Sequence, residues 1–462
     1  MSSSKIIFKK QFNQRIYNNL NIIKNIFLGS RFYWVIGGLS LLYLLSYFLP
    51  AFGVIAEFST AALVLFILLD TFLLFREKDP VFARREVPER LSNGDENVIN
   101  VWLENRYIFR IRATVIDELP AQLQVRDFSH MLSLENGERK QFSYTIRPVT
   151  RGEYQFGKLN IYVASPIQLI LRRFQIPEEI AVPVYPSFIQ MRKYELLAIS
   201  NHLSEAGIKK IRRVGHTLEF DQIREYVTGD DYRTINWKAT ARRRTFMVNH
   251  YQDEKSQQIY SVIDKGRVMK MPFDGMSLLD YAINASLVIS NIALNKQDKA
   301  GIITFANTVD SIVTADRKQG QVSRIMDVLY NQTTRHLESD YARLFALILQ
   351  KINRRSLILL FTNFETLNAL RRQLPFLRKI AKKHLLVVIF FENTELSGLT
   401  GQPAQKLETV YLKTIAEQFI FEKKQIVKEL QRYGIYAVLT PPENLSVNTI
   451  NQYLYLKARG FI

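Results

Sequence analysis

The chain has 462 residues, of which 47% are hydrophobic and 23% are charged. This is the composition of an ordinary globular protein, and it excludes a chain that is disordered, collagen-like or coiled-coil throughout. At about 100 to 200 residues per domain, the length predicts two to four folding units. The absence of cysteine excludes disulfides, thiol nucleophiles and thiolate metal sites. The net charge of +19 predicts an anionic neighbour, either nucleic acid or an acidic membrane surface.

Two apolar runs near the start of the chain predict a transmembrane helical hairpin over residues 32–75. Residues 32–49 carry no charge, and a second run follows the turn at residues 50–53 and ends at Phe75. At about 1.5 Å per helical residue, each run covers roughly the 30 Å hydrocarbon core of a bilayer. A buried pair of core helices is disfavoured because soluble helices carry a polar face, and a cleaved signal peptide because two apolar runs follow one another. We expect Asp70, in the second run, to reach the membrane interface rather than to relay protons.

Basic residues predict the orientation of this hairpin, because lysine and arginine gather on the cytoplasmic side of a membrane. Arg76, Lys78, Arg84 and Arg85 follow the second run. The cations that precede the first run, with no acid among them, are Lys5, Lys9, Lys10, Arg15, Lys24 and Arg31. We therefore expect two spans, with both termini and the remaining domains in the cytoplasm. Apolar residues alternate with cations over residues 1–31, which predicts a basic amphipathic tail against anionic membrane lipid.

Residues 80–186 predict an antiparallel β-sandwich, because short apolar and β-branched runs recur between turn residues. The turn candidates are residues 92–95, 135–138 and 150–152. The predicted strands cover residues 98–103, 107–116, 123–128, 141–146, 152–159, 161–163 and 180–185. The polar residues of this region indicate no more than a scaffold or a docking surface.

Residues 187–256 predict a helical connector over residues 187–210, followed by a segment that is dense in charge, aromatic rings and glycine. Gly229 with Asp230 and Asp231 predicts a turn into a helix over residues 232–241, with an aspartate that caps its free amides. Residues 245–251 predict a strand. In a structural interpretation, the acids Glu219, Asp221, Glu225, Asp230 and Asp231 pair with Arg224, Arg233, Lys238 and Arg242.

In a functional interpretation, the same segment is a surface that binds a partner or an anion, because arginine and tryptophan dominate interface hot spots. The candidate partner-binding residues are Glu219, Phe220, Arg224, Tyr226, Gly229, Asp230, Asp231, Arg233, Trp237, Lys238 and Arg242.

The spacing of these residues resembles the signature of the bacterial family called domain of unknown function 58. The resemblance lies in Gly215-x-x-x-Glu219-Phe220-x-x-x-Arg224-Glu225-Tyr226-x-x-Gly229-Asp230-Asp231-x-Arg233-x-Ile235-x-Trp237-Lys238-Ala239-x-Ala241-Arg242. Upstream, Arg147-Pro148-Val149-x-Arg151-Gly152-x-Tyr154 resembles the segment that precedes the signature in that family. The resemblance implies a membrane-anchored protein of the bacterial inner membrane, with a carboxy-terminal part similar to a von Willebrand factor type A domain. It also implies a MoxR-type AAA+ ATPase, commonly encoded beside the family's members.

Independently of that resemblance, residues 257–462 predict a doubly wound, Rossmann-like α/β domain, because strands and helices alternate. The continuous apolar runs at residues 357–361 and 385–391 predict parallel strands buried on both faces. Further strands are predicted at residues 259–263, 300–305, 309–313 and 436–439, and helices at residues 278–294, 319–330, 341–352, 412–433 and 447–459. The fold class is therefore multidomain: a membrane hairpin, a β-sandwich and a type A-like α/β domain.

Type A domains that bind a divalent cation carry Asp-x-Ser-x-Ser on one loop, Thr on a second and Asp on a third, and oxygen ligands of this kind suit magnesium. The corresponding loops here keep Asp264 but lose both serines, and they offer Ser339 and Asn363 in place of Thr and Asp. Lys265 and Arg267 also oppose a bound cation. We therefore expect degenerate metal-type loops without a metal, in which Asp264 caps a turn or pairs with Lys265 or Arg267, or whose edge contacts a protein.

No nucleotide-binding, zinc-protease or serine-hydrolase motif occurs, and the six histidines show no ligand spacing. The basic clusters at residues 212–213 and 242–244 have acids nearby and no nucleic-acid reader motif. We therefore expect no enzyme activity, no cofactor and no nucleic-acid partner. The sequence favours a non-catalytic, membrane-anchored adaptor or assembly protein that works with a MoxR-type AAA+ ATPase through the signature segment and the type A-like domain. The alternative is a divalent-metal-dependent binding protein or enzyme that uses the loop edge around Asp264.

Overall fold

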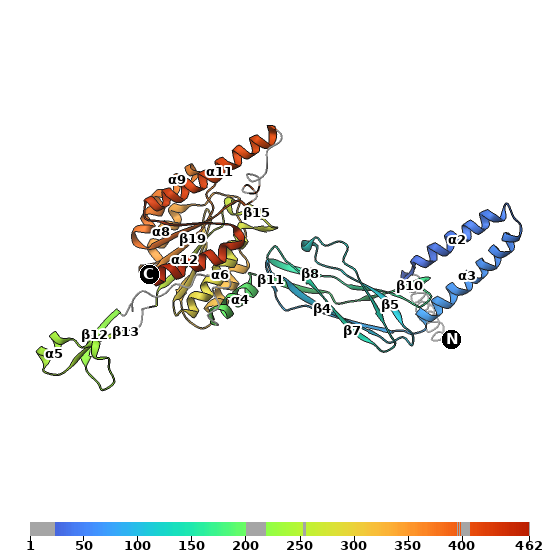
Figure 1. The fold of residues 1–462 in the computed structure, drawn as a ribbon, viewed down its shortest axis with the longest axis horizontal. Helices are drawn as coiled ribbons and strands as arrows, with labels where there is room; N and C mark the ends of the chain where they lie inside the picture. Colours follow the sequence, from blue (N-terminus) through green and yellow to red (C-terminus); the bar gives the residue numbers. More distant parts are fainter. Residues whose placement is uncertain are drawn as a thin grey trace, which may run out of the picture. The chain divides into compact units, whose positions relative to one another are not determined.

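A computed structural model of the chain describes residues 24–199, 219–252, 256–394, 396, 398 and 407–461. The predicted amphipathic tail falls almost wholly outside these residues. The chain forms two compact units (Figure 1). The first holds the described residues up to Leu91, with Glu96–Pro148 and Glu153–Val184, and the second holds Ser92–Asp95, Val149–Gly152 and the residues from Tyr185 onward.

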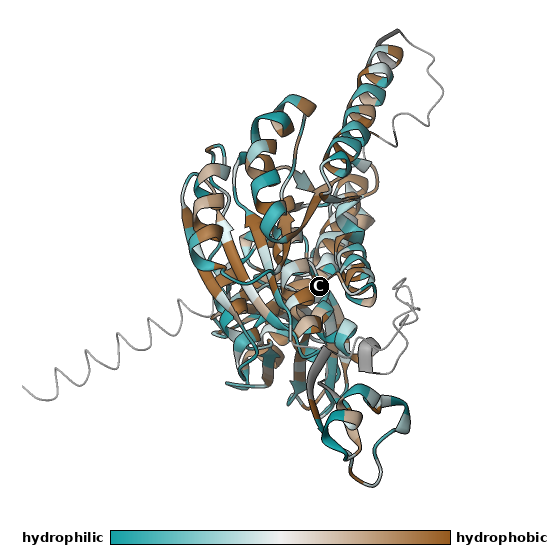
Figure 2. Cartoon of the chain, turned by 90° about the vertical axis from the view of Figure 1, so that its left-hand side faces the viewer, coloured by the Kyte–Doolittle hydropathy of each residue, from teal (hydrophilic) through white to brown (hydrophobic). Residues whose placement is uncertain are grey.

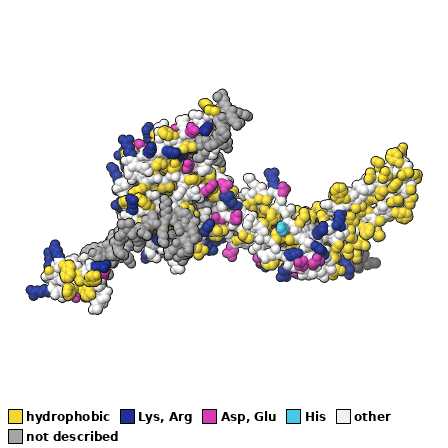
Figure 3. All heavy atoms as spheres, viewed as in Figure 1, with side chains coloured by type: hydrophobic (Ala, Val, Ile, Leu, Met, Phe, Trp, Pro, Cys, Tyr) yellow, Lys and Arg dark blue, Asp and Glu magenta, His cyan; other side chains and the backbone are white. Residues whose placement is uncertain are grey.

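The first unit contains two helices, α2 (Ser30–Ser46) and α3 (Ala51–Phe75), that lie side by side. In the described part of the chain, α3 is the one helix long and apolar enough to cross a membrane. Figure 3 shows the surface of both helices almost wholly covered by hydrophobic side chains. The hydroxyls of Tyr43 and Thr60 join the two helices at 3.0 Å. At about 1.5 Å per residue, the 17 residues of α2 fall short of a bilayer core, so the second span stays a prediction.

Antiparallel sheets form the rest of this unit, as predicted for a sandwich-like region. One sheet has the order β1-β10-β9-β5-β6, a second β2-β4-β7 and a third β3-β11-β8. The strand pairings of the first two sheets are all antiparallel. The strands are β1 (Ile26–Leu28), β2 (Val81–Glu86), β3 (Leu91–Ser92), β4 (Asn97–Asn105), β5 (Ile111–Asp117), β6 (His130–Leu134), β7 (Arg139–Ile146), β8 (Gly152–Phe156), β9 (Leu159–Ala164), β10 (Ile170–Ile176) and β11 (Ile180–Tyr185).

Alternation along the strands places one face of each in a core. In β4, Ile99, Val101 and Leu103 are fully buried while the residues between them are partly exposed, the pattern of a sheet with one wet face. The strand predicted at residues 123–128 is wrong. The structure has a short 3-10 helix η1 (Ala121–Leu123) there, followed by chain outside any strand.

Asp70 does not reach outward from α3, contrary to the prediction. Its side chain is fully buried, and Oδ2 accepts hydrogen bonds from the backbone N–H groups of Leu169 (3.0 Å) and Ile170 (2.9 Å). Ile170 is the first residue of β10 and Leu169 precedes it, and a buried amide without an acceptor is costly. Asp70 therefore attaches α3 to the sheet, near the point where the Leu74 carbonyl accepts a hydrogen bond from the Tyr107 hydroxyl (2.7 Å).

The second unit is built on a six-stranded sheet of order β18-β17-β14-β19-β20-β21, in which β18 alone runs antiparallel to its neighbour. The strands are β14 (Gln258–Asp264), β17 (Lys299–Phe305), β18 (Val309–Asp316), β19 (Leu357–Phe361), β20 (Leu385–Phe391) and β21 (Tyr436–Thr440). A small hairpin of β15 (Pro272–Phe273) and β16 (Met276–Ser277) follows the first of them, after the 3-10 helix η4 (Arg267–Met269). In Figure 2 the strands of the large sheet are predominantly hydrophobic.

Helices cover both faces of this sheet. Successive residues of each buried strand point to opposite sides, so both faces of the sheet are apolar and both are covered. Ile259, Ile263 and Leu357 face one core, whereas Tyr260 and Val262 face the other. The first face is covered by α4 (Phe188–Ile199), α6 (Leu278–Asn295), α7 (Gln321–Tyr330) and α12 (Leu445–Ala458), the last of which follows the 3-10 helix η5 (Pro442–Asn444). The second face is covered by α8 (Tyr341–Lys351), α9 (Leu367–Lys383) and α11 (Leu407–Arg432).

The signature segment forms a small structure of its own. Strands β12 (Glu219–Glu225) and β13 (Met247–Gln252) pair antiparallel, and a 3-10 helix η3 (Tyr232–Thr234) and helix α5 (Trp237–Arg243) lie between them in the chain. The helix predicted over residues 232–241 is thus wrong in its start, because Ile235 forms a β-bridge with Val248 and interrupts it. Of the predicted connector, residues 200–210 lie outside the described part of the chain.

Candidate functional site

The turn of the signature segment is fixed by Asp230. Its carboxylate accepts from the Arg224 guanidinium (2.6 Å) and from the backbone N–H of Val227 (3.0 Å). Gly229 has a φ of +113°, a backbone conformation that side-chain-bearing residues rarely adopt. Arg224, Gly229 and Asp230 therefore hold the shape of the turn, as in the structural interpretation.

Two side chains cap the short helices that follow. Asp231 accepts from the backbone N–H of Arg233 (2.9 Å) at the start of η3, and Asn236 accepts from the N–H of Ala239 (3.0 Å) at the start of α5. The Asn236 amide also donates to Asn249 on β13 (2.8 Å), which ties α5 to the strand. The sequence predicted a capping aspartate at Asp230 or Asp231, and Asp231 is the one that caps η3, whereas the role of Asn236 was missed.

The remaining predicted residues whose side chains the structure describes face solvent. Trp237 is 67% exposed and Tyr226 is 38% exposed, and the rings of both lie edge-on to Phe246, at 6.5 and 6.4 Å between centroids. The exposed cations beside them are Arg233, Lys238 and Arg242, while Tyr232 and Val227 are further exposed apolar residues that sequence reasoning missed. Figure 3 shows hydrophobic and basic side chains together on this segment. We call the set Tyr226, Val227, Tyr232, Arg233, Trp237, Lys238, Arg242 and Phe246 the aromatic–basic patch. The side chains of Glu219 and Phe220 lie outside what the structure describes.

The three degenerate metal-type loops come together at the carboxyl edge of the large sheet. Asp264 ends β14, Ser339 precedes α8 and Asn363 follows β19, and all three line one pocket of about 160 Å³. A Cβ atom at Gly266 would lie 2.2 Å from the Ser339 hydroxyl. The Ser339 hydroxyl therefore occupies the space that a serine at position 266 would need.

Asp264 is fully enclosed by donors from this chain. Oδ1 accepts from the backbone N–H of Gly266 (2.8 Å) and from the Ser339 hydroxyl, and Oδ2 accepts from the hydroxyls of Thr362 (2.7 Å) and Tyr341 (3.2 Å). Burial raises the pKa of Asp264, while these hydrogen bonds act in the opposite direction. Burial and the charge of Asp264 also raise the pKa of Tyr341 far above its ordinary value. Thr362 and Tyr341 were missed by the sequence analysis.

This donor set does not fit a divalent cation. Such an ion needs several free oxygen ligands, but both oxygens of Asp264 accept hydrogen bonds from the protein, and Oδ1 of Asn363 accepts from the ammonium of Lys423 (2.6 Å). Among the described residues, no group of three or more acidic or histidine side chains is placed to hold a metal. Of the two predicted roles, Asp264 caps the turn through the N–H of Gly266 and does not pair with a neighbouring cation. Lys265 pairs with Asp310 and Arg267 with Glu338.

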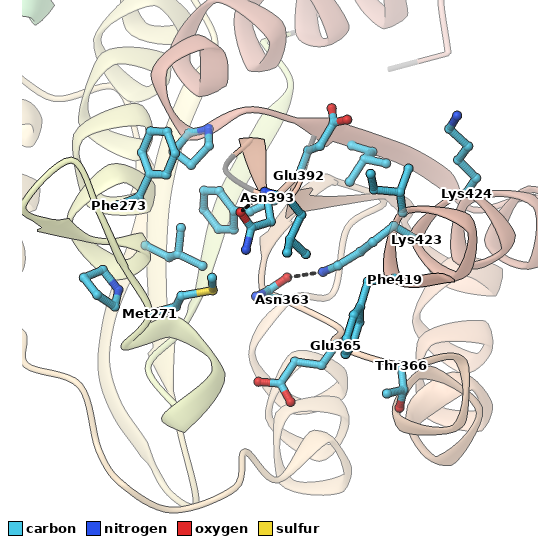
Figure 4. Close-up of a pocket in the computed structure, with 17 residues that line it drawn as sticks. Met271, Phe273, Asn363, Glu365, Thr366, Glu392, Asn393, Phe419, Lys423 and Lys424 are labelled. Atoms are coloured by element: carbon cyan, nitrogen blue, oxygen red, sulfur yellow. Dashed lines mark hydrogen bonds between the residues drawn. The ribbon is translucent and has the colours of Figure 1, made fainter. Parts of the chain in front are cut away.

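A larger pocket, of about 460 Å³, adjoins the same loops (Figure 4). Its wall is mainly apolar, with Phe273 from β15, Phe391 from β20 and Phe419 from α11. Lys423 of α11 runs inward to Asn363, whereas Glu392 and Lys424 point outward. Burial lowers the pKa of Lys423 to about 8, and the charge of Glu365 acts against that change. Sequence reasoning missed this lysine.

The described chain is thus a mixed α/β protein with a sandwich-like antiparallel region, one apolar helix long enough to cross a membrane, and a compact signature segment that exposes aromatic and basic side chains. Residues 222–399 match the family model described as "Protein of unknown function DUF58". This match agrees, over residues 222–399, with the resemblance stated from the signature.

Among curated proteins, the chain is similar to the "Uncharacterized protein YeaD" of Bacillus subtilis (strain 168), with 23% identity over 252 residues. The match covers 52% of this chain and 63% of that relative, so the chain spans less than two thirds of the relative's length. Solved structures match over about a quarter of the chain. They include the CARDB domain of PF1109 from Pyrococcus furiosus (13% identity, 23% of this chain, 94% of that chain, TM-score 0.16) and native alpha-2-macroglobulin from Escherichia coli (19% identity, 23% and 17%, TM-score 0.20). These TM-scores are too low to support a statement about fold or function.

Proposed function

We propose that this protein is a membrane-anchored, non-catalytic adaptor or assembly protein that works with a MoxR-type AAA+ ATPase. The observation that carries the proposal is the aromatic–basic patch, in which Trp237, Arg233 and Arg242 of the DUF58 signature are exposed. By contrast, Arg224, Asp230 and Asp231 form hydrogen bonds within the segment. Exposed tryptophan beside arginine is typical of a binding hot spot, since these side chains contribute most to interface free energy.

The anchor in this proposal is a hairpin in which both α2 and α3 cross the bacterial inner membrane, with the soluble parts in the cytoplasm. Three contacts support it. Strand β1, which precedes α2, pairs with β10, and Asp70 and Leu74 near the end of α3 bond to β10 and Tyr107. The start of α2 and the end of α3 are therefore held by the same sheet, as a two-span anchor requires.

The large sheet, with parallel strands and helices on both faces, is in this proposal a von Willebrand factor type A-like domain whose loop edge no longer takes a metal. Lysine and hydroxyl donors occupy the oxygens of Asn363 and Asp264 that such an ion would need. The edge is then available for protein contact, and nucleotide hydrolysis comes from the partner ATPase.

The test is co-purification of the full-length chain with the MoxR-type ATPase from the chain's own host, using the variant Trp237→Ala/Lys238→Ala. Both side chains are exposed and neither caps a helix, so the fold should persist. We expect the ATPase to be lost from this variant and retained by the matched control Tyr411→Ala, which removes an equally exposed aromatic residue from α11. Full retention by the Trp237 variant, or no ATPase with the unmodified chain, contradicts the proposal.

A further inference from the structure

The larger pocket carries a charge that the protein itself does not balance. Lys423 projects into it from α11, and its ammonium has one hydrogen-bond partner among the described residues, the amide oxygen of Asn363. In the described part of the chain, no carboxylate lies within the 4 Å of an ion pair with this ammonium. The ring of Phe390 lies 5.6 Å away. A lysine ammonium can donate three hydrogen bonds, so capacity to bind an anion remains.

The other charged groups of the pocket do not replace such an anion. Glu392 and Lys424 point outward in Figure 4, and Glu365, on the loop after β19, lowers the cost of the charge without reaching the ammonium. The rest of the pocket lining is mainly apolar, with Met271, Phe273 and Phe419 among it, and its further uncharged polar residues are Thr366 and Asn393. Partial burial of an ammonium group in such surroundings is costly unless it is paired.

The dimensions and the single cation define the ligand. A volume of about 460 Å³ lies in the range of small-molecule sites, which are mostly apolar with a few polar groups that orient the ligand. One ammonium and one amide suit a monoanionic carboxylate, whereas a phosphate dianion calls for several cations or a row of backbone amides.

We propose that this pocket binds a small amphiphilic carboxylic acid, whose hydrocarbon body contacts Phe273, Phe391 and Phe419 and whose carboxylate pairs with Lys423. The site is separate from the aromatic–basic patch, and the inference does not depend on the ATPase partner. The Asn363 side chain lines both this pocket and the loop-edge pocket, so a carboxylate on Lys423 would lie beside the Asp264 loops.

The experiment measures acetylation of Lys423 in the full-length chain, held in nanodiscs of zwitterionic lipid at pH 8. Trace acetic anhydride labels exposed and low-pKa lysines, and mass spectrometry separates Lys423 from its neighbour Lys424, which serves as the internal control. Octanoate is the probe, and octanamide is its uncharged match. We expect octanoate to protect Lys423 saturably, at a concentration about tenfold lower than octanamide requires, which is the factor that one charge-assisted hydrogen bond provides. Lys424 should be labelled at an unchanged rate.

A second measurement uses calorimetry on the variants Lys423→Met and Lys424→Met in the same nanodiscs, with empty nanodiscs as the blank. Lys423→Met should remove the preference for octanoate over octanamide, and Lys424→Met should retain it. The proposal is overturned if Lys423 is not protected, if octanamide protects it equally, or if Lys424 is protected to the same extent.

Discussion

At the scale of single residues, His384 has no evident role for its charge or its hydrogen-bonding groups. It follows α9, is 5% exposed, and neither ring nitrogen has a hydrogen-bond partner in the described part of the chain. Burial, and to a smaller extent the charge of Lys383, lower the pKa of His384 below its ordinary value of 6.5. A histidine with a lowered pKa in the folded state binds protons more weakly there than in the unfolded state. It therefore destabilises the fold as the pH falls below about 6.5.

We predict that His384→Leu reduces the acid sensitivity of the second unit. The unfolding midpoint of the full-length chain should fall less between pH 7.5 and pH 5.5 in this variant than in the unmodified protein, because the group that gains a proton on unfolding is gone. The unfolding midpoints of the variant and of the unmodified protein should be similar at pH 7.5, where the histidine is neutral in the folded and the unfolded state. Differential scanning fluorimetry measures both, with the exposed His336→Leu as the control. An equal fall in all three proteins would show that His384 takes up no extra proton on unfolding.

The residues of the loop edge could be predicted from the sequence only in part. Asp264 and Asn363 lie at the carboxyl ends of the parallel strands β14 and β19, so their convergence is a consequence of parallel topology, whereas Ser339 comes from the loop before α8. Thr362 and Tyr341 complete the shell around Asp264, but one ends an apolar run and the other begins an amphipathic helix, where a hydroxyl is unremarkable. Lys423 is one of several lysines along α11, and only the packing of that helix against the sheet distinguishes it.

At the scale of secondary-structure elements, apolar runs predict the buried strands well and the polar-rich elements poorly. The strands β19 and β20 were predicted at residues 357–361 and 385–391, because they are buried on both faces. Strand β2 was missed, since Arg84 and Arg85 interrupt its pattern, although Arg85 is buried through its pair with Asp117. Helix α9 was missed as well. It contains Pro375, which normally ends a helix.

The structure explains Arg151, a residue of the motif that lies upstream of the signature. Arg151 belongs to the second unit, where it donates to the Asp280 carboxylate in the first turn of α6 (2.7 Å) and to the Gln332 carbonyl after α7 (2.6 Å). It also donates to the carbonyl of Leu329. The side chains of Arg151 and Asp280 are 6% and 9% exposed. One guanidinium therefore joins the start of α6 to the end of α7.

We predict that Arg151→Met destabilises the second unit by about 3–5 kcal/mol, because it leaves the buried Asp280 charge without its cation. The second change Asp280→Asn should recover part of that loss by removing the charge. The matched control Arg343→Met breaks an exposed pair with Asp340 and should cost at most about 1 kcal/mol. The unfolding midpoints of the three variants are compared by thermal unfolding. A midpoint for Arg151→Met equal to that of the control would mean that the buried pair contributes nothing to stability.

At the scale of the whole molecule, the sequence predicts more of the membrane anchor than the structure supports. The sequence predicts two spans from two apolar runs. Of the helices in the described residues, α3 alone meets the length and hydropathy of a span, while α2 lies beside it and also exposes large hydrophobic side chains. An anchor of two spans and an anchor of α3 alone place the start of α2 on opposite sides of the bilayer. In both anchors, the α2–α3 turn and the end of α3 lie on opposite sides.

The absence of cysteine makes the two arrangements distinguishable, because each introduced thiol is then the single thiol in the chain. We predict that a membrane-impermeant maleimide, added to intact cells, labels Ala51→Cys but neither Lys24→Cys nor Asp79→Cys, and labels all three after the membrane is permeabilised. This follows if β1 and the end of α3 are both held by β10, which keeps Lys24 and Asp79 on one side. Labelling of Lys24→Cys together with Ala51→Cys in intact cells would instead mean that α3 crosses alone. The pairing of β1 with β10 could then not form on the cytoplasmic side, and the anchor would be a single helix.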